Sequence, residues 1–461
     1  MSESSLKPDN LNYKSVAMHN GRYRLRKIPL NNITGISVTL QPSSTTLLEW
    51  KLPAGQVFNP ARSSIEYSIQ LAANAKSNWN FEDCFEICQS IQFCNASGMY
   101  LTDLQYAGIY TSAVRKIDIA KADFECSDNT SGLYRAIAPA SNPFPPVAVM
   151  PAVNAYRAAA SAAVQTALTA VEPQYAAVSA ATVAATITRS VPLSCFTQTA
   201  LGQDLDMIFS EDMYIRMQVA SSDKVGFLAN AGADPTAGAT AFQVQPIVSN
   251  LYLQLAMQVD EVIVASVKDK FLRGDMAFSI PFVYGWSIAT ATGVASVQLQ
   301  LNNQYGKLLK RLIHVPIVTG LGVTPNQVYD HQNLNGAKIS SYQTFLDSVP
   351  LQDSVLSCLQ PVASGLKGMD DYRENRMLLR GSAIESSLAY YFNWVHCDSF
   401  SQPKRDHVLL PLASIMEGLD LTFPRQWTMQ ATTATPLTNY IFGTFVRQVL
   451  ASPQGTQILV A

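Results

Sequence analysis

The sequence predicts an all-β protein, and three observations support that prediction. Apolar residues alternate with polar ones in many short stretches, the pattern of strands that bury one face. Turn-forming Asn, Pro and Gly pairs separate these stretches. Helical periodicity is confined to a few local segments. Many short strands joined by irregular loops are typical of β-sandwiches and barrels, so we expect that architecture.

The alternating stretches follow one another along most of the chain. Each places apolar residues two positions apart, which puts them on one face of an extended strand. The clearest are Ile36–Leu40, Ile65–Leu71, Met213–Val219, Leu251–Val259, Val297–Leu301 and the β-rich run Phe442–Leu450. Turn signals between them include Asn59-Pro60, Asn302-Asn303 and Asn335-Gly336.

Two segments have helical patterns instead. Asp260 is placed to cap a helix over Glu261–Arg273, and Gly274 is placed to end it. The strand pattern stops before this helix and resumes after it, so we expect it to join two β-domains. A second helix is predicted from Asp371 to about Leu379.

One segment differs in composition from the rest. Between Pro151 and Ser190, 15 of 40 residues are Ala, and residues 155–171 have the composition of a helix. Flanking prolines mark this segment as an insertion between strands, and long insertions in loops cost little stability. We interpret it as an exposed or subunit-covering excursion; the alternative is a low-complexity surface loop.

The composition excludes two classes of function. The chain has 461 residues, 48% hydrophobic and 14% charged, whereas about 25% charged is usual. Intrinsic disorder is excluded, because disordered chains are rich in charge. With a net charge of −2, the chain is not a polybasic nucleic-acid binder. So little charge predicts that other subunits cover much of the surface.

No compartment or metal signal is evident. The polar segment Met1–Asn20 lacks the apolar core of a secretory signal, and no run reaches the ~18 apolar residues of a membrane span, so we expect a soluble protein. The seven cysteines are unevenly spaced. Cys84, Cys88 and Cys94 form the one cluster, without the second pair that a zinc site needs. We expect them to be buried thiols.

Enzymatic motifs are missing from the sequence. It contains no Gly-x-Gly-x-x-Gly, nucleophile elbow or phosphate-binding Gly-Lys-Ser/Thr. The five histidines are not spaced for a shared metal, and His396 has no functional partner in sequence. Asp204 and Asp206 would share one strand face, but we interpret them as a solvated turn. We therefore predict no catalytic residue, no cofactor and no metal.

The strongest charge feature lies near the N-terminus. Arg22, Arg24 and Arg26 point the same way on an extended chain, and Lys27 follows. This segment is either a solvated arm or an arm that touches an anionic neighbour. Four charges are too few for strong independent binding of nucleic acid.

The order of these motifs resembles the double jelly-roll major capsid proteins of icosahedral DNA viruses, a lineage that includes giant-virus, virophage, polinton-like and adenovirus-related groups. The resemblance covers most of the chain in pattern and order. It rests on an opening strand pair around an Asn-Pro loop, a capped helix between the two halves, a mid-barrel segment and a set of closing strands. These stretches are Ser37–Leu71, Asn250–Ser279, Tyr342–Asp353 and Leu419–Val460.

The resemblance implies two tandem jelly rolls, each an eight-stranded sandwich, in a non-enzymatic shell protein of the virion. It implies an N-terminal arm (1–30), a first jelly roll (31–259) with an Ala-rich insertion at about 135–193, a linker helix (260–273) and a second jelly roll (274–461). Three chains would form a pseudo-hexagonal capsomer that tiles the shell beside penton and minor capsid proteins. The arm would be a candidate contact to an internal membrane or the genome.

Two other functions are alternatives to this one. An enzyme on two tandem barrels needs metal-binding histidines at strand spacing, and this sequence has none. A carbohydrate-binding sandwich, such as a viral or bacterial spike, is the stronger alternative. The 19 Tyr and 5 Trp residues would suit it, but no repeated Trp pattern or calcium-binding loop is present.

Overall fold

Buried and more exposed side chains alternate along the strands. The computed structural model describes residues 22–31, 37–42, 44–71, 77–79, 87–114, 185–222, 226–228, 245–318, 339–357, 396–400, 418–433 and 435–459. In β9 (Met213–Val219), every second side chain is buried and those between are not. This is the pattern predicted for that stretch, and the all-β prediction is confirmed. No helix among the described residues is long and apolar enough to cross a membrane.

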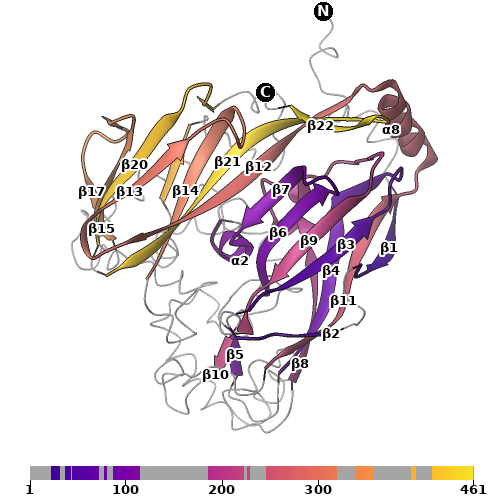
Figure 1. The fold of residues 1–461 in the computed structure, drawn as a ribbon, viewed down its shortest axis with the longest axis horizontal. Helices are drawn as coiled ribbons and strands as arrows, with labels where there is room; N and C mark the ends of the chain where they lie inside the picture. Colours follow the sequence, from indigo (N-terminus) through magenta and orange to yellow (C-terminus); the bar gives the residue numbers. More distant parts are fainter. Residues whose placement is uncertain are drawn as a thin grey trace, which may run out of the picture.

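The first half of the chain forms two main sheets (Figure 1). Strands of one sheet follow the order β1-β11-β4-β8, with β2 also paired to β11; the other has the order β3-β9-β6-β7. The first sheet contains β1 (Tyr23–Pro29), β2 (Ser37–Thr39), β4 (Phe58–Leu71), β8 (Ala185–Pro192) and β11 (Ile247–Gln258). The second contains β3 (Thr46–Leu52), β6 (Cys88–Asn95), β7 (Tyr100–Gln105) and β9 (Met213–Val219). A separate ribbon pairs β5 (Ser77–Trp79) with β10 (Gly226–Leu228).

The second half repeats this arrangement. One sheet has the order β12-β21-β14-β18, with β19 on β14 and β22 on β21; the other has the order β13-β20-β15-β16, with β17 on β15. The first comprises β12 (Met276–Thr290), β14 (Leu308–Val318), β18 (His396–Ser399), β19 (Leu419–Asp420), β21 (Leu437–Ser452) and β22 (Gly455–Leu459). The second comprises β13 (Gly293–Leu301), β15 (Ile339–Leu346), β16 (Val349–Pro350), β17 (Leu356–Ser357) and β20 (Arg425–Thr433).

Both halves have jelly-roll connectivity. In each, the first, eighth, third and sixth strand positions along the chain form one sheet, and the second, seventh, fourth and fifth form the other. β1 with β2 occupies the first position of the first half, and β12 occupies that of the second. The fifth position is β7 in the first half and β16 with β17 in the second. Two sheets linked in this way are a jelly roll, so the chain folds as two in tandem.

The helix between the halves forms where its caps predict. Helix α8 spans Glu261–Arg273; the Asp260 carboxylate accepts hydrogen bonds from the backbone of Val262 and Ile263, and Gly274 ends the helix at φ +75°. Phe271 of α8 is buried in a small cluster with Val57, Ile208 and Ala451, which come from both halves. The helix therefore packs onto both jelly rolls as well as linking them.

Further short helical turns lie in the first half. They are α2 (Ala107–Ile109), a π-helical turn at Tyr110–Val114 and 3₁₀ turns at Leu193–Cys195 and Ala200–Gly202. The structure places the end of the predicted 135–193 insertion in β8, where the alternating residues of Ala185–Pro192 pair with β4. Residues 135–184 and the predicted helix at 371–379 lie outside the described residues.

Candidate functional site

A joint between the two jelly rolls fixes their relative position. Strand β7, at the edge of the first jelly roll, lies against β12 at the edge of the second (Figure 1). Just after β7, the Tyr106 ring packs edge-on against Tyr440 at a centroid distance of 5.0 Å, and Tyr110 packs against Phe442 at 5.3 Å. Such edge-to-face pairs contribute about 0.5–1.5 kcal/mol each beyond the burial of their area.

A buried arginine adds polar contacts to this joint. Arg447 of β21 donates to the carbonyl oxygen of Tyr100 in the first jelly roll at 3.0 Å and to that of Tyr305 in the second at 2.6 Å. Its guanidinium carbon lies 3.4 Å from the centre of the Phe282 ring. Burial lowers the pKa of Arg447 to about 10, which leaves it protonated at neutral pH. One hydrophobic core cluster includes residues of both jelly rolls, so the two behave as one unit.

The basic residues predicted as an arm form an edge strand. β1 pairs along its length with β11, so residues 23–29 belong to the sheet of the first jelly roll. Arg24, Arg26 and Lys27 are exposed, and Ile28 is buried in the core. Arg24 and Arg26 share a strand face, as predicted. Lys27 lies on the other face, with its Nζ 3.7 Å from the centre of the Tyr252 ring.

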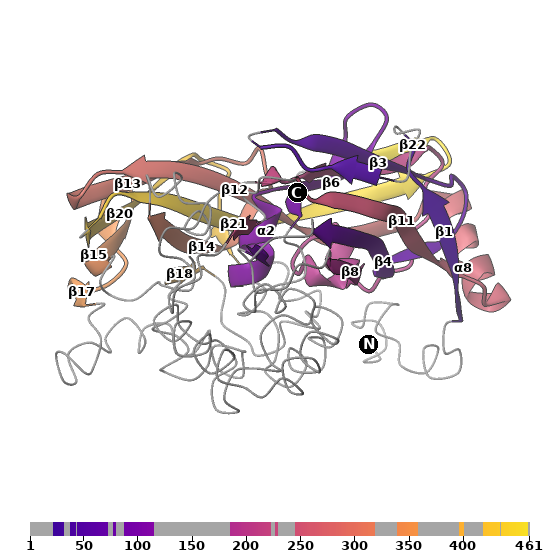
Figure 2. The same ribbon diagram turned by 90° about the horizontal axis from the view of Figure 1, so that it is seen from below.

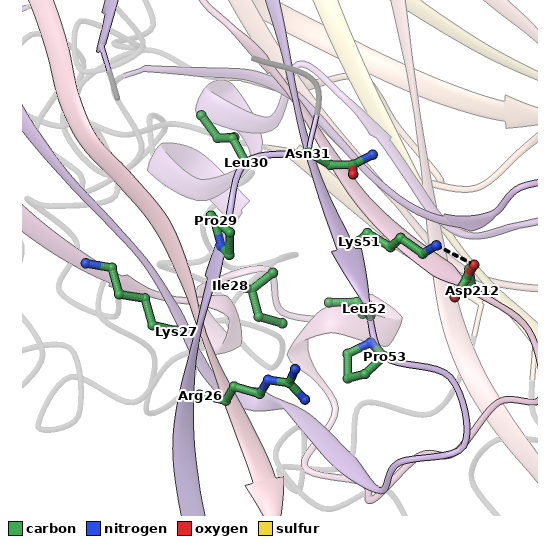
Figure 3. A pocket seen from close by; sticks show the side chains of 10 residues that line it. All are labelled: Arg26, Lys27, Ile28, Pro29, Leu30, Asn31, Lys51, Leu52, Pro53 and Asp212. Atoms are coloured by element: carbon green, nitrogen blue, oxygen red, sulfur yellow. Dashed lines mark ion pairs between the residues drawn. The ribbon is translucent and has the colours of Figure 1, made fainter. Parts of the chain in front are cut away.

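An open groove of about 310 Å³ lies between β1 and β3 (Figure 3). Arg26 borders it on the β1 side and donates to Gln56 Oε1 at 3.1 Å. Lys51 borders it on the β3 side and is paired with Asp212 at 2.6 Å. The lining residues are Arg26, Lys27, Ile28, Pro29, Leu30, Asn31, Lys51, Leu52, Pro53 and Asp212. The described residues that line the groove include no aromatic ring, so they offer no stacking platform for a sugar.

The Asp204–Asp206 pair joins a network that the sequence did not predict. Asp206 accepts from the Tyr23 hydroxyl of β1 at 2.9 Å and from Gln258 at 2.9 Å. Asp204 accepts from Arg62 and Asn59. Burial alone would raise the pKa of Asp204, but these two hydrogen bonds outweigh it and lower that pKa. The pair thus holds the start of β1 onto the sheet rather than forming a simple solvated turn.

A second polar cluster is buried inside the second jelly roll. His314 of β14 lies directly opposite His396 of β18, although the two are far apart in sequence. His314 Nε2 is 2.8 Å from Asn439 Oδ1, and His396 Nε2 is 3.1 Å from Asp398 Oδ1. Asp398 also accepts from the Trp427 indole at 2.6 Å. Antiparallel pairing created this cluster, which spacing along one strand cannot reveal.

Burial and hydrogen bonding set the charges of this cluster. Burial lowers the pKa of His314 to about 3, so the ring is neutral at pH 7. Burial alone would raise the pKa of Asp398, but the His396 ring and the Trp427 and Thr344 donors hold it below its ordinary value. The cluster is enclosed by sheet residues, which suits a structural role.

The described cysteines are buried thiols. Cys88, Cys94, Cys195 and Cys397 are buried, and burial raises the pKa values of Cys88 and Cys94. Cys84, the third residue of the predicted cluster, lies outside the described residues. Within the described part of the chain, no group of three or more His, Cys, Asp or Glu side chains is placed to hold a metal ion.

Comparisons with known proteins agree with the topology. No protein-family model matches the sequence, and neither does any curated protein. Solved structures do match. A chain of the Sputnik virophage structure gives a TM-score of 0.55 at 11% identity, covering 95% of this chain and 88% of that one. PBCV-1 Vp54, fitted into a reconstruction of Sputnik, gives 0.51 at 10% identity, covering 96% and 97%.

A third match is the Faustovirus major capsid protein, with a TM-score of 0.51 at 9% identity, covering 94% of this chain and 90% of that one. At such identities the likeness concerns the fold. Together with the strand order of both halves, it establishes the class: the chain is a double jelly-roll protein, as the sequence predicts.

Proposed function

We propose that this protein is the major capsid protein of an icosahedral DNA virus and that it forms the shell of the virion. The observation that supports this most is full-length coverage. The match to PBCV-1 Vp54 spans 96% of this chain and 97% of that one, so it includes both jelly rolls and the helix between them. Its structural neighbours include a major capsid protein, so we expect the protein not to be an enzyme.

The proposed mechanism is self-assembly. Three chains, each with two jelly rolls held rigidly by the joint at β7 and β12, close into a trimer with six barrels around its axis. Trimers then tile laterally, next to penton and minor capsid proteins. We take residues 31–259, together with strand β1 (Tyr23–Pro29), and residues 274–461 as the two assembling jelly rolls, and residues 260–273 as their linker. The interfaces belong to the obligate class, larger than ~2,000 Å² in total.

In the proposed shell, the basic residues near the N-terminus lie on a fixed edge strand rather than on a mobile arm. Because Tyr23–Pro29 is paired into the sheet, its exposed Arg24, Arg26 and Lys27 are held at a fixed edge of the first jelly roll. A fixed edge suits a protein neighbour better than a membrane or a genome, whose contacts favour a mobile arm.

The test is the mass and shape of the purified protein. Size exclusion with light scattering should give three chain masses across micromolar and submicromolar concentrations, and negative-stain images should show pseudo-hexagonal particles. A monomer at micromolar concentration would count against the proposal. If that monomer also bound a glycan array, the carbohydrate-binding alternative would replace it.

A further inference from the structure

Strand β18 (His396–Ser399) is a short strand at the edge of the second jelly roll. It pairs with β14 over four residues, whereas β14 pairs with β21 over ten. In the order of the described strands it comes last, next to β14 (Figure 2). Local opening of a fold starts at elements with few partners. This strand can therefore leave its sheet without breaking the pairing between β14 and β21.

The side chains that β18 turns into the core are ionisable. His396 and Asp398 lie on the inner face of the strand, and both are buried. Strand geometry places Cys397, which is also buried, on the opposite face. Burial of such polar groups is favourable only while hydrogen bonds compensate for the lost water. The inner face of β18 therefore depends on polar contacts rather than on apolar packing.

Three neighbouring elements donate hydrogen bonds to Asp398. The Trp427 indole of β20 is 2.6 Å from its carboxylate, and the Thr344 hydroxyl of β15 is 3.1 Å away. The Gln352 amide, which follows β16, lies 3.4 Å away. Hydrogen bonds to an ionised acceptor are stronger than those between neutral groups. These contacts join β18 to the facing sheet.

Two imidazoles complete the network. His314 of β14 lies opposite His396, and its Nε2 is 2.8 Å from Asn439 Oδ1 of β21. The His396 ring lies 4.5 Å from the Tyr342 ring of β15. On β14, the buried Lys310 and Arg311 lie beside the far end of β18. Among the described residues, the titratable side chains that meet on the inner face of β18 are those of His314, His396, Asp398 and Tyr342.

Acid weakens this network through His314. Burial lowers the pKa of this ring to about 3, against an ordinary value of 6.5. Departure of β18 would uncover the ring, so between these values the opened form binds a proton that the closed form does not. The opening equilibrium should therefore rise about 25-fold from pH 7 to pH 5. Asp398, whose pKa is lowered in the closed form, acts in the same direction only at lower pH.

We propose that β18 is an acid-released edge strand, which leaves β14 at mildly acidic pH while β12, β21 and β14 stay paired. Release would uncover the edge of β14 and open one side of the second jelly roll. The release is a property of a single chain. Its test therefore does not depend on whether the protein forms a shell.

The thiol of Cys397 reports the release, because it lies on β18 and is buried. Wild-type protein is labelled with 4,4′-dithiodipyridine, which also reacts with thiols in acid, and the labelled peptides are quantified by mass spectrometry. Each rate is divided by that of the same cysteine in the urea-unfolded chain at the same pH. This ratio should rise about 25-fold for Cys397 from pH 7 to pH 5. The ratios for Cys88 and Cys195 of the first jelly roll should stay at least about tenfold lower.

Two variants separate titration from simple loss of stability. His314→Gln removes the titrating ring, so the rise at Cys397 should fall below about fivefold. The matched control is Trp427→Phe, which removes a donor to Asp398 but leaves His314 in place. It should increase labelling of Cys397 at both pH values and keep the rise between them.

Each outcome decides the proposal. Labelling of Cys397 that does not rise between pH 7 and pH 5 overturns it. Ratios for Cys88 that equal those for Cys397 also overturn it, because the whole chain is then opening. A full rise in His314→Gln assigns the acid response to another group and refutes the mechanism. If that variant does not fold, the wild-type comparison of Cys397 with Cys88 still decides.

Discussion

Acid should destabilise the second jelly roll through His314. This ring is buried and neutral, with a pKa of about 3 in the fold against an ordinary 6.5. The groups that face it are Asn439 on β21 and His396 and Asp398 on β18. Between pH 6.5 and 3 the unfolded chain binds a proton at this position and the folded chain does not. The free energy of unfolding therefore falls as the pH falls through this window.

The size of the effect follows from the two pKa values. Lowering the pH from 7 to 4.5 should cost about 2.5 kcal/mol from this one group. Carboxyl groups such as Asp398, whose pKa is lowered in the folded chain, also lose stability as they are protonated at still lower pH. Stopping at pH 4.5 avoids most of that contribution.

The assay is urea unfolding at fixed protein concentration, followed by tryptophan fluorescence at each pH. The matched variant is His314→Gln, which keeps a partner for Asn439 but does not titrate. Its stability at pH 7 will differ from wild type, so the readout is the slope against pH. If His314→Gln loses as much stability as wild type between pH 7 and 4.5, the buried neutral imidazole is not the cause.

Three further predictions concern other parts of the fold. Trp427→Phe keeps an aromatic ring but removes the indole N–H donor 2.6 Å from buried Asp398, so unfolding should need about 1.5–3 kcal/mol less free energy; an unchanged denaturation midpoint contradicts this. Arg447→Met removes the bonds to Tyr100 and Tyr305 and should split one calorimetric transition into two, whereas a single unshifted transition would show that the aromatic pairs suffice. Thiol titration of the native protein should label no more than three of the seven cysteines, because four are buried, and a fourth reactive thiol refutes this; the four are Cys88, Cys94, Cys195 and Cys397.

Local features of the fold were predictable because their causes are local. The strand at Met213–Val219 follows from alternation within seven residues. The helix at Glu261–Arg273 follows from its two caps, Asp260 and Gly274. The double jelly roll itself came from the order of such segments, through the resemblance, rather than from any single motif.

Features that depend on pairing between distant strands were not predictable. The start of β1 was expected to be part of an N-terminal arm, but its register with β11 brings Tyr23 to Asp206. Likewise, His314 and His396 become neighbours only because β14 and β18 pair. The spacing of these residues along the sequence does not determine the register of these strand pairs. The register depends on which strands come together when the whole domain folds.

The position of β21 has a consequence for synthesis of the chain. This strand pairs with β12 along one side and with β14 along the other, so it is the middle of its sheet although it is the last long strand to be made. During translation β12 and β14 therefore emerge well before the strand that separates them, and each presents an unpaired edge. The first jelly roll, complete once β11 has emerged, can fold earlier. The nascent second jelly roll is thus the stage most exposed to aggregation, and chaperone dependence of folding should map to residues 276–452.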